Sequence, residues 1–223
     1  MANEPGVDQR ARHWDAAYTG SGAEGVSWYQ AAPRMSLTLI EELRISRDAA
    51  VIDIGGGASQ LVDQLVERGF SDLTVLDVSA SALQELGMRL GDSPVIRLHK
   101  DVLDWLPDRR YDLWHDRALF HFLVTEADRR RYLEILHAAI KPGGLVILAT
   151  FALEGPDHCS GLPVTRYSAE HLSDVLGDAF VPLETRHEKH TTPRGSVQPF
   201  TWLAGRVQTS QACCHEEPQC VTD

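Results

Sequence analysis

Between residues 50 and 150, short apolar runs alternate with longer segments whose apolar residues recur at helical spacing. Residues 51–54 and 73–77 are such runs, and each contains or ends in an acidic residue. A short apolar run bounded by turn residues is typical of a buried strand, and a 3.6-residue period is typical of an amphipathic helix. Strands that alternate with helices in this way predict βαβ units and a parallel sheet.

Capping residues mark where the expected helices begin and end. One helix follows Ser79, a favoured N-cap residue, and stops at Gly91, a favoured C-cap residue. A longer helix opens at residues 125–128, buries an apolar stripe that includes Ile140, and ends at Pro142. These signals predict helices on both sides of the second strand and before the fifth.

The pattern changes beyond residue 155. Residues 168–176 indicate one more helix, and residues 181–190 alternate in period two. Residues 192–195 have the composition of a turn, and residues 197–207 indicate a second strand. The last third of the chain is therefore expected to contribute a helix and two strands.

The first 30 residues have no strong period, so we expect them to be irregular or weakly helical. They are rich in large aromatic residues, namely Trp14, Tyr18, Trp28 and Tyr29. We divide the chain into an aromatic-rich arm and helix at residues 1–48, which we expect to act as a cap, a main domain at residues 49–207, and a flexible Cys-containing tail at residues 208–223.

Composition narrows the class of protein. The chain has 223 residues, of which 43% are apolar and 24% charged, as expected of one globular domain. No apolar run approaches the roughly 18 residues that span a bilayer, and the first residues lack the pattern of a secretory signal. We therefore expect a cytoplasmic protein with no membrane partner. The net charge of −11 argues against a nucleic-acid partner, because phosphate binding normally needs a basic surface.

The four cysteines do not form a disulfide framework. Cys159 lies in the body of the chain, whereas Cys213, Cys214 and Cys220 lie close to its end. Thiolates bind soft metal ions, but adjacent cysteines without C-x-x-C spacing are not typical of structural zinc. We predict no metal site.

A glycine turn follows the first expected strand. Residues 53–57 read Asp-Ile-Gly-Gly-Gly, and Asp77 ends the next strand 24 residues after Asp53. A strand, a glycine turn and a helix followed by an acid about 20 residues later are typical of adenosine-containing cofactors in α/β folds. Gln60 stands where the dinucleotide fingerprint needs its third glycine, so we do not expect NAD to bind.

At this turn the sequence resembles the class I S-adenosylmethionine (SAM) dependent methyltransferases, whose first motif is acid-x-Gly-x-Gly. Three later segments match that family's motifs in order: a third strand at residues 95–102, a fourth-strand motif at residues 111–116, and a Lys-Pro-Gly-Gly turn into the fifth strand at residues 140–148. The resemblance implies a Rossmann-like α/β fold. Its seven-stranded sheet would be mostly parallel, with a C-terminal antiparallel hairpin and helices on both faces.

The resemblance also implies that SAM binds at the carboxyl ends of the strands. Asp53 would face the ammonium of SAM, Asp77 would hold the ribose, and Asp101 would meet the adenine. Independently of the resemblance, the rings of Trp14, Tyr18, Trp28 and Tyr29 are candidates to face the sulfonium, because aromatic faces attract cations. The implied cofactor-binding residues are Asp53, Gly55, Gly57, Asp77, Val78, Asp101, Val102, His115 and Trp28.

Residues after the fourth and fifth strands are candidates for contact with the methyl acceptor. The candidate catalytic residues are His115, Asp116 and His121, because His titrates near neutral pH and a base is needed when the nucleophile arrives protonated. Arg117 and Arg166 are candidate clamps for an anionic substrate. Cys159 is a third candidate for contact with the substrate.

We therefore expect a SAM-dependent methyltransferase that acts on a small nucleophile such as a thiol, an amine, a carboxylate or a metalloid species. Two alternatives stay open: a protein lysine methyltransferase, and a SAM-binding module without turnover. Amino methylation of nucleic acids is disfavoured, because residues 116–119 read Asp-Arg-Ala-Leu where that chemistry uses Asp/Asn-Pro-Pro-Tyr. The sequence does not indicate the acceptor or the oligomeric state.

Overall fold

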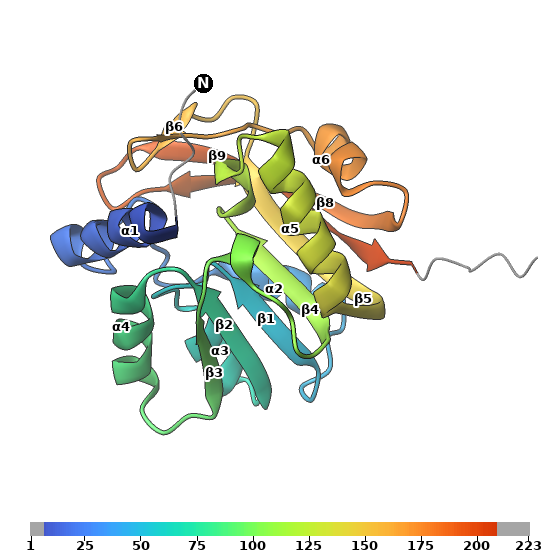
Figure 1. Ribbon diagram of the computed structural model, residues 1–223, viewed down its shortest axis with the longest axis horizontal. Coiled ribbons are helices and arrows are strands. Elements are labelled where there is room, and N and C mark those ends of the chain that lie inside the picture. The colour runs from blue at the N-terminus through green and yellow to red at the C-terminus, as the bar shows by residue number, and fades with distance from the viewer. Residues whose placement is uncertain (1–6, 209–223) are drawn as a thin grey trace, which may run out of the picture.

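The computed structural model describes residues 7–208 and contains one seven-stranded sheet with the order β3-β2-β1-β4-β5-β9-β8 (Figure 1). Neighbouring strands from β3 to β5 are parallel, and β9 is antiparallel to both β5 and β8. The fold expected from the sequence is confirmed. The strands of this sheet are β1 Ala50–Ile54, β2 Asp72–Asp77, β3 Val95–His99, β4 Tyr111–Arg117, β5 Ile140–Phe151, β8 Phe180–Thr191 and β9 Val197–Val207.

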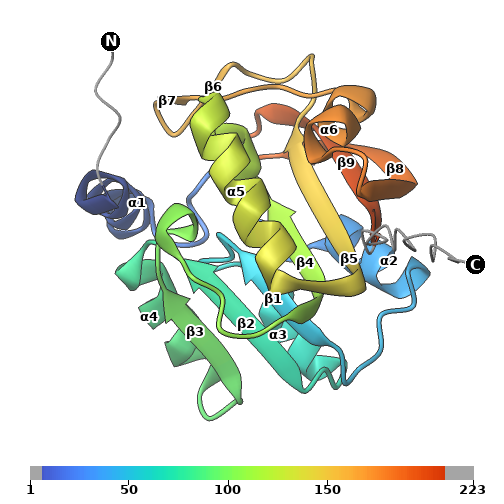
Figure 2. The same cartoon turned by 45° about the vertical axis from the view of Figure 1, so that its right-hand side comes forward.

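Helices cover both faces of the sheet, as Figures 1 and 2 show with α5 and α6 in front and α2 and α3 behind. Alternate residues of β1 divide between two cores: Ile52 packs with the α5 and α6 side chains, and Val51 packs with those of α2, α3 and α4. The helices are α1 Val7–Ser21, α2 Arg34–Glu42, α3 Leu61–Glu67, α4 Ala80–Leu90, α5 Glu126–Ala139 and α6 Ala169–Leu176. Short elements complete the fold: the 3₁₀ turns η1 Val102–Asp104 and η2 Phe120–Phe122, and the small hairpin β6 His158–Cys159 with β7 Leu162–Pro163.

Strand register brings the candidate residues to one edge. Asp53 pairs with His115 across β1 and β4, and Asp77 ends β2 on the other side of β1. The chain leaves β1 toward β2 and β3 in one direction and later returns to β4 and β5 in the other. Ligands of open α/β sheets bind outside the carboxyl ends of the strands at such a switch point.

Ser79 acts as the N-cap that the sequence predicts, and Thr125 and Ser168 cap two further helices in the same way. The side chains of Ser79, Thr125 and Ser168 each accept a backbone N–H three residues later, at the starts of α4, α5 and α6. One expected boundary is wrong: Ile140 begins β5 and does not continue α5, because it has extended dihedrals and pairs with Tyr111.

The N-terminal segment differs from its sequence-based expectation, because residues 7–21 form a 15-residue helix. Tertiary contacts explain this. Asp15 of α1 accepts hydrogen bonds from the Ser79 hydroxyl and from the backbone and hydroxyl of Ser81 at the start of α4, and Tyr18 is buried. The expected cap at residues 1–48 stays a prediction, and the expected tail lies outside the described residues except for Gln208. Within residues 7–208, no helix is both long and apolar enough to cross a membrane, and no cluster of metal-binding side chains occurs.

Candidate active site

The glycine turn after β1 brings backbone close to the site. Gly55 has a φ of 66°, which L side chains rarely adopt, and a Cβ there would lie 2.7 Å from Leu119 Cδ1. A Cβ on Gly56 would lie 2.4 Å from Asp53 Oδ2. Residues larger than glycine therefore do not fit at position 55 or at position 56. The acid-x-Gly-x-Gly motif requires glycine only at the first of these two positions.

Gly57 makes room for two polar side chains. It has a φ of 46°, and a Cβ there would lie 2.6 Å from the Tyr18 hydroxyl and 2.9 Å from Asp77 Oδ2. Trp28 Nε1 donates to the Tyr18 hydroxyl at 3.2 Å. The turn thus packs directly against the end of β2 and against α1.

Asp77 is buried at the end of β2. Its Oδ1 accepts the Ser79 N–H at 2.7 Å. Burial, with smaller contributions from the negative charges of Asp53 and Asp15, raises the pKa of Asp77 to about 7. A buried carboxyl with a raised pKa beside a glycine turn is a candidate ligand-binding group.

Asp53 and His115 form a buried pair behind the glycine turn. His115 Nδ1 lies 2.7 Å from Asp53 Oδ1, and His115 Nε2 lies 3.0 Å from the Ser36 hydroxyl of α2. Asp53 Oδ2 is buried and has no hydrogen-bond partner among residues 7–208. Since a buried carboxylate oxygen without a donor is costly, this atom indicates a missing cationic or N–H group.

Asp101 follows β3 and contacts the N-terminal helix. Its Oδ1 accepts the Leu103 N–H at 3.0 Å, and its Oδ2 accepts Arg10 Nε at 2.6 Å. The Asp101 side chain is 6% exposed and that of Arg10 28% exposed. Helix α1 therefore reaches the same acid that the resemblance assigns to adenine recognition.

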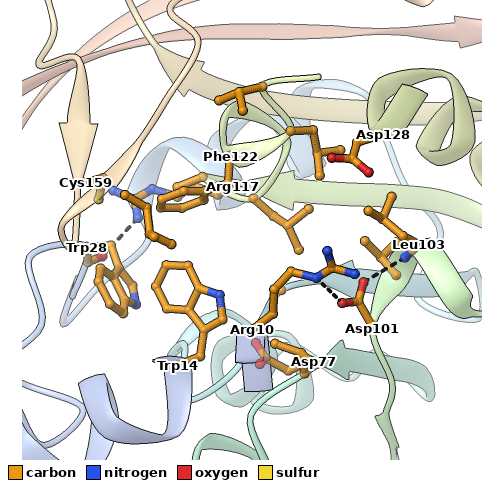
Figure 3. Close-up of a pocket in the computed structure, with 18 of the residues that line it drawn as sticks. Arg10, Trp14, Trp28, Asp77, Asp101, Leu103, Arg117, Phe122, Asp128 and Cys159 are labelled. Atoms are coloured by element: carbon orange, nitrogen blue, oxygen red, sulfur yellow. Dashed lines mark hydrogen bonds and ion pairs between the residues drawn. The ribbon is translucent and has the colours of Figure 1, made fainter. Parts of the chain in front are cut away.

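These groups surround one cavity of about 390 Å³, which lies in the size range of small-ligand sites. Figure 3 shows Arg10, Asp77 and Asp101 at one end and Trp28, Cys159 and Arg117 at the other. A smaller cavity of about 40 Å³ holds Asp53 and His115 and shares Gly55 with the larger one. Eight of the nine cofactor candidates line two adjoining cavities: Gly55, Asp77, Val78, Asp101, Val102 and Trp28 line the first, and Asp53, Gly55, His115 and Trp28 line the second. Gly57 lines neither and packs against Tyr18 and Asp77.

Two of the candidate catalytic residues are used inside the fold. Asp116 Oδ1 accepts the Leu119 and Phe120 N–H groups, and its Oδ2 accepts the Tyr132 hydroxyl at 2.6 Å. Burial raises the pKa of Asp116 to about 6. His121 Nδ1 accepts the Phe151 N–H at 3.2 Å, and burial lowers its pKa to about 3. Neither residue lines the cavities described above.

The three candidate substrate residues are not brought together. Arg117 and Cys159 both line the large cavity, and burial raises the pKa of the Cys159 thiol. Arg166 lies outside it and donates to the carbonyl oxygens of Leu153 and Gly155 at 3.0 and 3.2 Å.

Several lining residues were not expected from the sequence as contacts of this site. Arg10 approaches Asp101 from α1, Phe200 of β9 lies against the Arg117 guanidinium, and Phe122 of η2 and Gln198 of β9 line the same cavity. Gln198 and Phe200 lie more than 80 residues from Arg117 in the chain. No local pattern signals such a contact, because it arises only when β9 inserts beside β5.

The chemistry of these groups fits SAM. The unpartnered Asp53 Oδ2 matches an ammonium group, and the buried Asp77 carboxyl matches a pair of ribose hydroxyls. The three glycines also let the turn pack closely against Asp53, Asp77 and Leu119, so that these side chains and the turn lie together at the site. The residues present therefore fit the cofactor that the sequence resemblance implies.

Comparison with known proteins supports the same assignment. A protein-family model described as a methyltransferase domain matches residues 52–146. "EEF1A lysine methyltransferase 2" of Danio rerio is 26% identical over an alignment of 155 residues, which covers 62% of this chain and 66% of that protein. "Trans-aconitate 2-methyltransferase" of Rhizobium rhizogenes is 22% identical over 174 residues, which are 78% of this chain and 64% of that protein. The chain thus spans slightly less than two thirds of the length of these curated relatives.

Solved structures share the fold. The Burkholderia thailandensis 1,6-didemethyltoxoflavin-N1-methyltransferase, solved with its substrate and S-adenosylhomocysteine, superposes with a TM-score of 0.69 at 19% identity. The match covers 94% of this chain and 92% of that one. With the family model and the motif order, the resemblance seen in the sequence is confirmed: the chain carries the methyltransferase domain and the fold of the class I SAM-dependent methyltransferases.

Proposed function

We propose that this protein uses SAM to methylate a small-molecule nucleophile. The observation that carries the proposal is the continuous cavity that runs from Asp77 and Asp101 to Arg117 and Cys159. One end offers the polar groups expected of a cofactor site, and the other end is lined mainly by apolar and aromatic side chains. A volume of about 390 Å³ for both ends together favours a small acceptor.

Each cofactor candidate has a role in this proposal. Asp53 Oδ2 receives the ammonium end, Asp77 accepts the ribose hydroxyls, and Asp101 with Val102 bounds the adenine. Gly55 and Gly57 allow the backbone to approach the ligand. Bound SAM carries the methyl group on a sulfonium, and transfer of this methyl group to the acceptor leaves a neutral thioether.

The chain's own contribution is alignment and exclusion of water. A general base is needed only when the acceptor is protonated at its reacting atom. Asp116 and His121, two of the candidate bases, hold the segment after β4 by hydrogen bonds to Leu119 and Phe151. We propose that both residues position the segment after β4. We infer that the acceptor is already unprotonated at its reacting atom when it binds, or that it loses this proton to water.

Protein lysine methylation is the second candidate, because curated relatives from fish, mouse and human bear that activity in their names. A lysine side chain would have to enter a cavity that already holds the Arg117 guanidinium. Since like charges repel strongly where water is scarce, we rank this candidate below the first. A SAM-binding module without turnover is the third candidate.

Isotope transfer from labelled SAM separates the three candidates. The purified protein and its Asp77→Ala variant are incubated with a cell extract and methyl-labelled SAM, and small molecules and proteins are then analysed by mass spectrometry. Label in small molecules that depends on Asp77 supports the proposal. Label in lysine residues of proteins would favour the second candidate. If SAM binds by calorimetry and neither fraction is labelled, the module without turnover is favoured.

A further inference from the structure

The acceptor end of the cavity contains a buried cation whose donors are incompletely used. Arg117 ends β4, and its Nη1 donates to the Trp28 carbonyl at 2.9 Å. Its Nε and Nη2 atoms are buried and have no hydrogen-bond partner among residues 7–208. Buried polar groups normally have partners, so two unpaired guanidinium donors beside a cavity indicate a missing acceptor.

Among residues 7–208 no carboxylate forms an ion pair with this guanidinium, although the negative charges of Glu188 and Asp53 act on it. Glu188 lies nearby, but its two oxygens accept hydrogen bonds from Gln30 and Trp202. Burial lowers the pKa of Arg117 to about 10, so the group stays cationic at neutral pH. The guanidinium therefore carries a positive charge with no ion-pair partner in the described part of the chain, beside the large cavity.

The other side chains that line the cavity indicate the polarity of the rest of the ligand. The guanidinium carbon lies 4.8 Å from the centre of the Phe200 ring. Gln198 Oε1 is buried without a partner among the same residues and could accept one hydrogen bond from a ligand. The remaining wall is apolar or aromatic and includes Trp14, Phe122, Phe151, Leu162 and Pro163.

We propose that Arg117 binds a carboxylate of the methyl acceptor, so that the acceptor is a small molecule with an anionic oxygen pair and an apolar or aromatic body. This inference rests on the proposed function and names its substrate class. Two N–H donors on one edge of a guanidinium match the two oxygens of a carboxylate. Arg117 is then a specificity-determining residue that selects against cationic acceptors.

A competing assignment is that Arg117 binds the carboxylate of SAM itself, because Arg117 also lines the smaller cavity that holds Asp53. The position of the guanidinium favours the acceptor. It stacks on β9 and lies beside Cys159 of β6 (Figure 3), on the side of β4 away from β1 and β2. The experiment distinguishes the two assignments.

The test measures binding of three matched probes to the protein saturated with S-adenosylhomocysteine (SAH). Benzoate is the anion, benzamide its neutral counterpart and benzylamine the cation, and each is titrated by calorimetry or ligand-observed NMR. We expect benzoate to bind at least about tenfold more tightly than either other probe. Arg117→Gln should remove this preference, and Arg117→Lys should keep part of it. Arg194→Gln removes the same charge from an exposed position in the β8–β9 turn and should change nothing.

Three results would overturn the inference. They are equal or tighter binding of benzylamine, unchanged benzoate binding in a folded Arg117→Gln variant, and no binding of benzoate to the SAH complex. The cofactor assignment is checked separately with 5′-methylthioadenosine, which lacks the amino-acid end of SAH. If Arg117→Gln weakens SAH but not 5′-methylthioadenosine, Arg117 serves the cofactor and the inference fails. Failure of the wild-type protein to bind SAH would instead refute the proposed function.

Discussion

At the scale of single residues, the site is built from buried charges that have too few partners. Asp53 Oδ2 and the Nε and Nη2 atoms of Arg117 are unpaired among residues 7–208, and Asp77 has a raised pKa. Each of these features costs folding free energy, because a buried charge loses its hydration. Ligand binding can recover that cost, which is why such groups gather at functional sites.

Replacing Asp77 with Ala should weaken SAH binding by about 1–3 kcal/mol, because charge-assisted hydrogen bonds to the ribose are lost. Isothermal titration calorimetry measures the change directly. Asp92→Ala removes an exposed acid beyond α4 and is the matched control. Equal affinity of the Asp77→Ala variant and the wild type would contradict the assignment of Asp77.

The affinity for SAH should rise as the pH is raised from 6 to 8. The pKa of Asp77 is raised from 3.8 to about 7, so its carboxylate, the better acceptor for two hydroxyl groups, becomes the main form only across this range. The dependence should be absent in Asp77→Asn, whose side chain is neutral throughout. A flat profile for the wild-type protein would show that Asp77 is already ionised at pH 6 or does not contact the ligand.

The same shift predicts a stability effect of opposite sign. A folded-state pKa above the unfolded value means that folding favours the protonated form. The contribution of Asp77 to stability is therefore fully present below about pH 4 and is lost as the pH rises through about 7. Ligand-free Asp77→Asn should gain in melting temperature relative to the wild type between pH 5 and pH 8. A constant difference would contradict the raised pKa.

At the scale of elements, the glycine turn and α1 act together. Gly57 adopts a left-handed conformation and sits against the Tyr18 hydroxyl of α1 and the Asp77 carboxyl of β2. The turn's shape follows from local sequence, since only glycine adopts it without strain. The helix does not follow from local sequence, because α1 is held by hydrogen bonds that Ser79 and Ser81, more than 60 residues away, donate to the Asp15 carboxylate.

Gly57→Ala should abolish SAH binding, whereas Gly69→Ala should not. Both glycines have positive φ, 46° and 82°, so both substitutions introduce backbone strain of about 1 kcal/mol. Only the Cβ at position 57 would collide with the site, since nothing lies within 4 Å of a Cβ at position 69. Thermal melts measure the destabilisation that the backbone strain causes in both variants. Calorimetry measures the loss of SAH binding, which we expect only for Gly57→Ala. Similar SAH affinities for the two variants would contradict the role of the turn.

At the scale of the whole molecule, the parallel strand order creates the cleft and selects its ligand. The carboxyl ends of β1, β2 and β4 meet where the strand order reverses, so residues from distant motifs share one edge. The first helix after the turn begins at Leu61 with Gln60 as its N-cap, and no third glycine opens it to a pyrophosphate. The cleft therefore suits a ligand with an adenosine but no diphosphate.

SAH at about 100 times its dissociation constant should stabilise the fold by about 2.7 kcal/mol, which corresponds to a rise in melting temperature of roughly 5–10 °C. NAD at the same concentration should leave the melting temperature unchanged. Differential scanning fluorimetry with both ligands makes the comparison. An equal shift with NAD would overturn the assignment of the cofactor class.

The sequence by itself determined the alternation of strands and helices between residues 50 and 150, the helix cap at Ser79, and the glycine turn between Asp53 and Gly57. These features are encoded by residues close together in the chain, because periodicity, capping and left-handed turns depend on local geometry. The family motifs are also short continuous segments, and they predict the cofactor residues.

Only the tertiary structure decided which of the polar residues face the cavity. Asp116 lies beside Arg117 in β4 and His121 follows that strand, yet Asp116 and His121 are engaged by hydrogen bonds to backbone groups and to Tyr132. Of the three, only Arg117 lines the cavity and has unpaired donors among residues 7–208. Phe200 meets Arg117, and Gln198 lines the same cavity, because β9 pairs antiparallel with β5. The direction and burial of a side chain depend on packing between distant segments, which local sequence patterns do not encode.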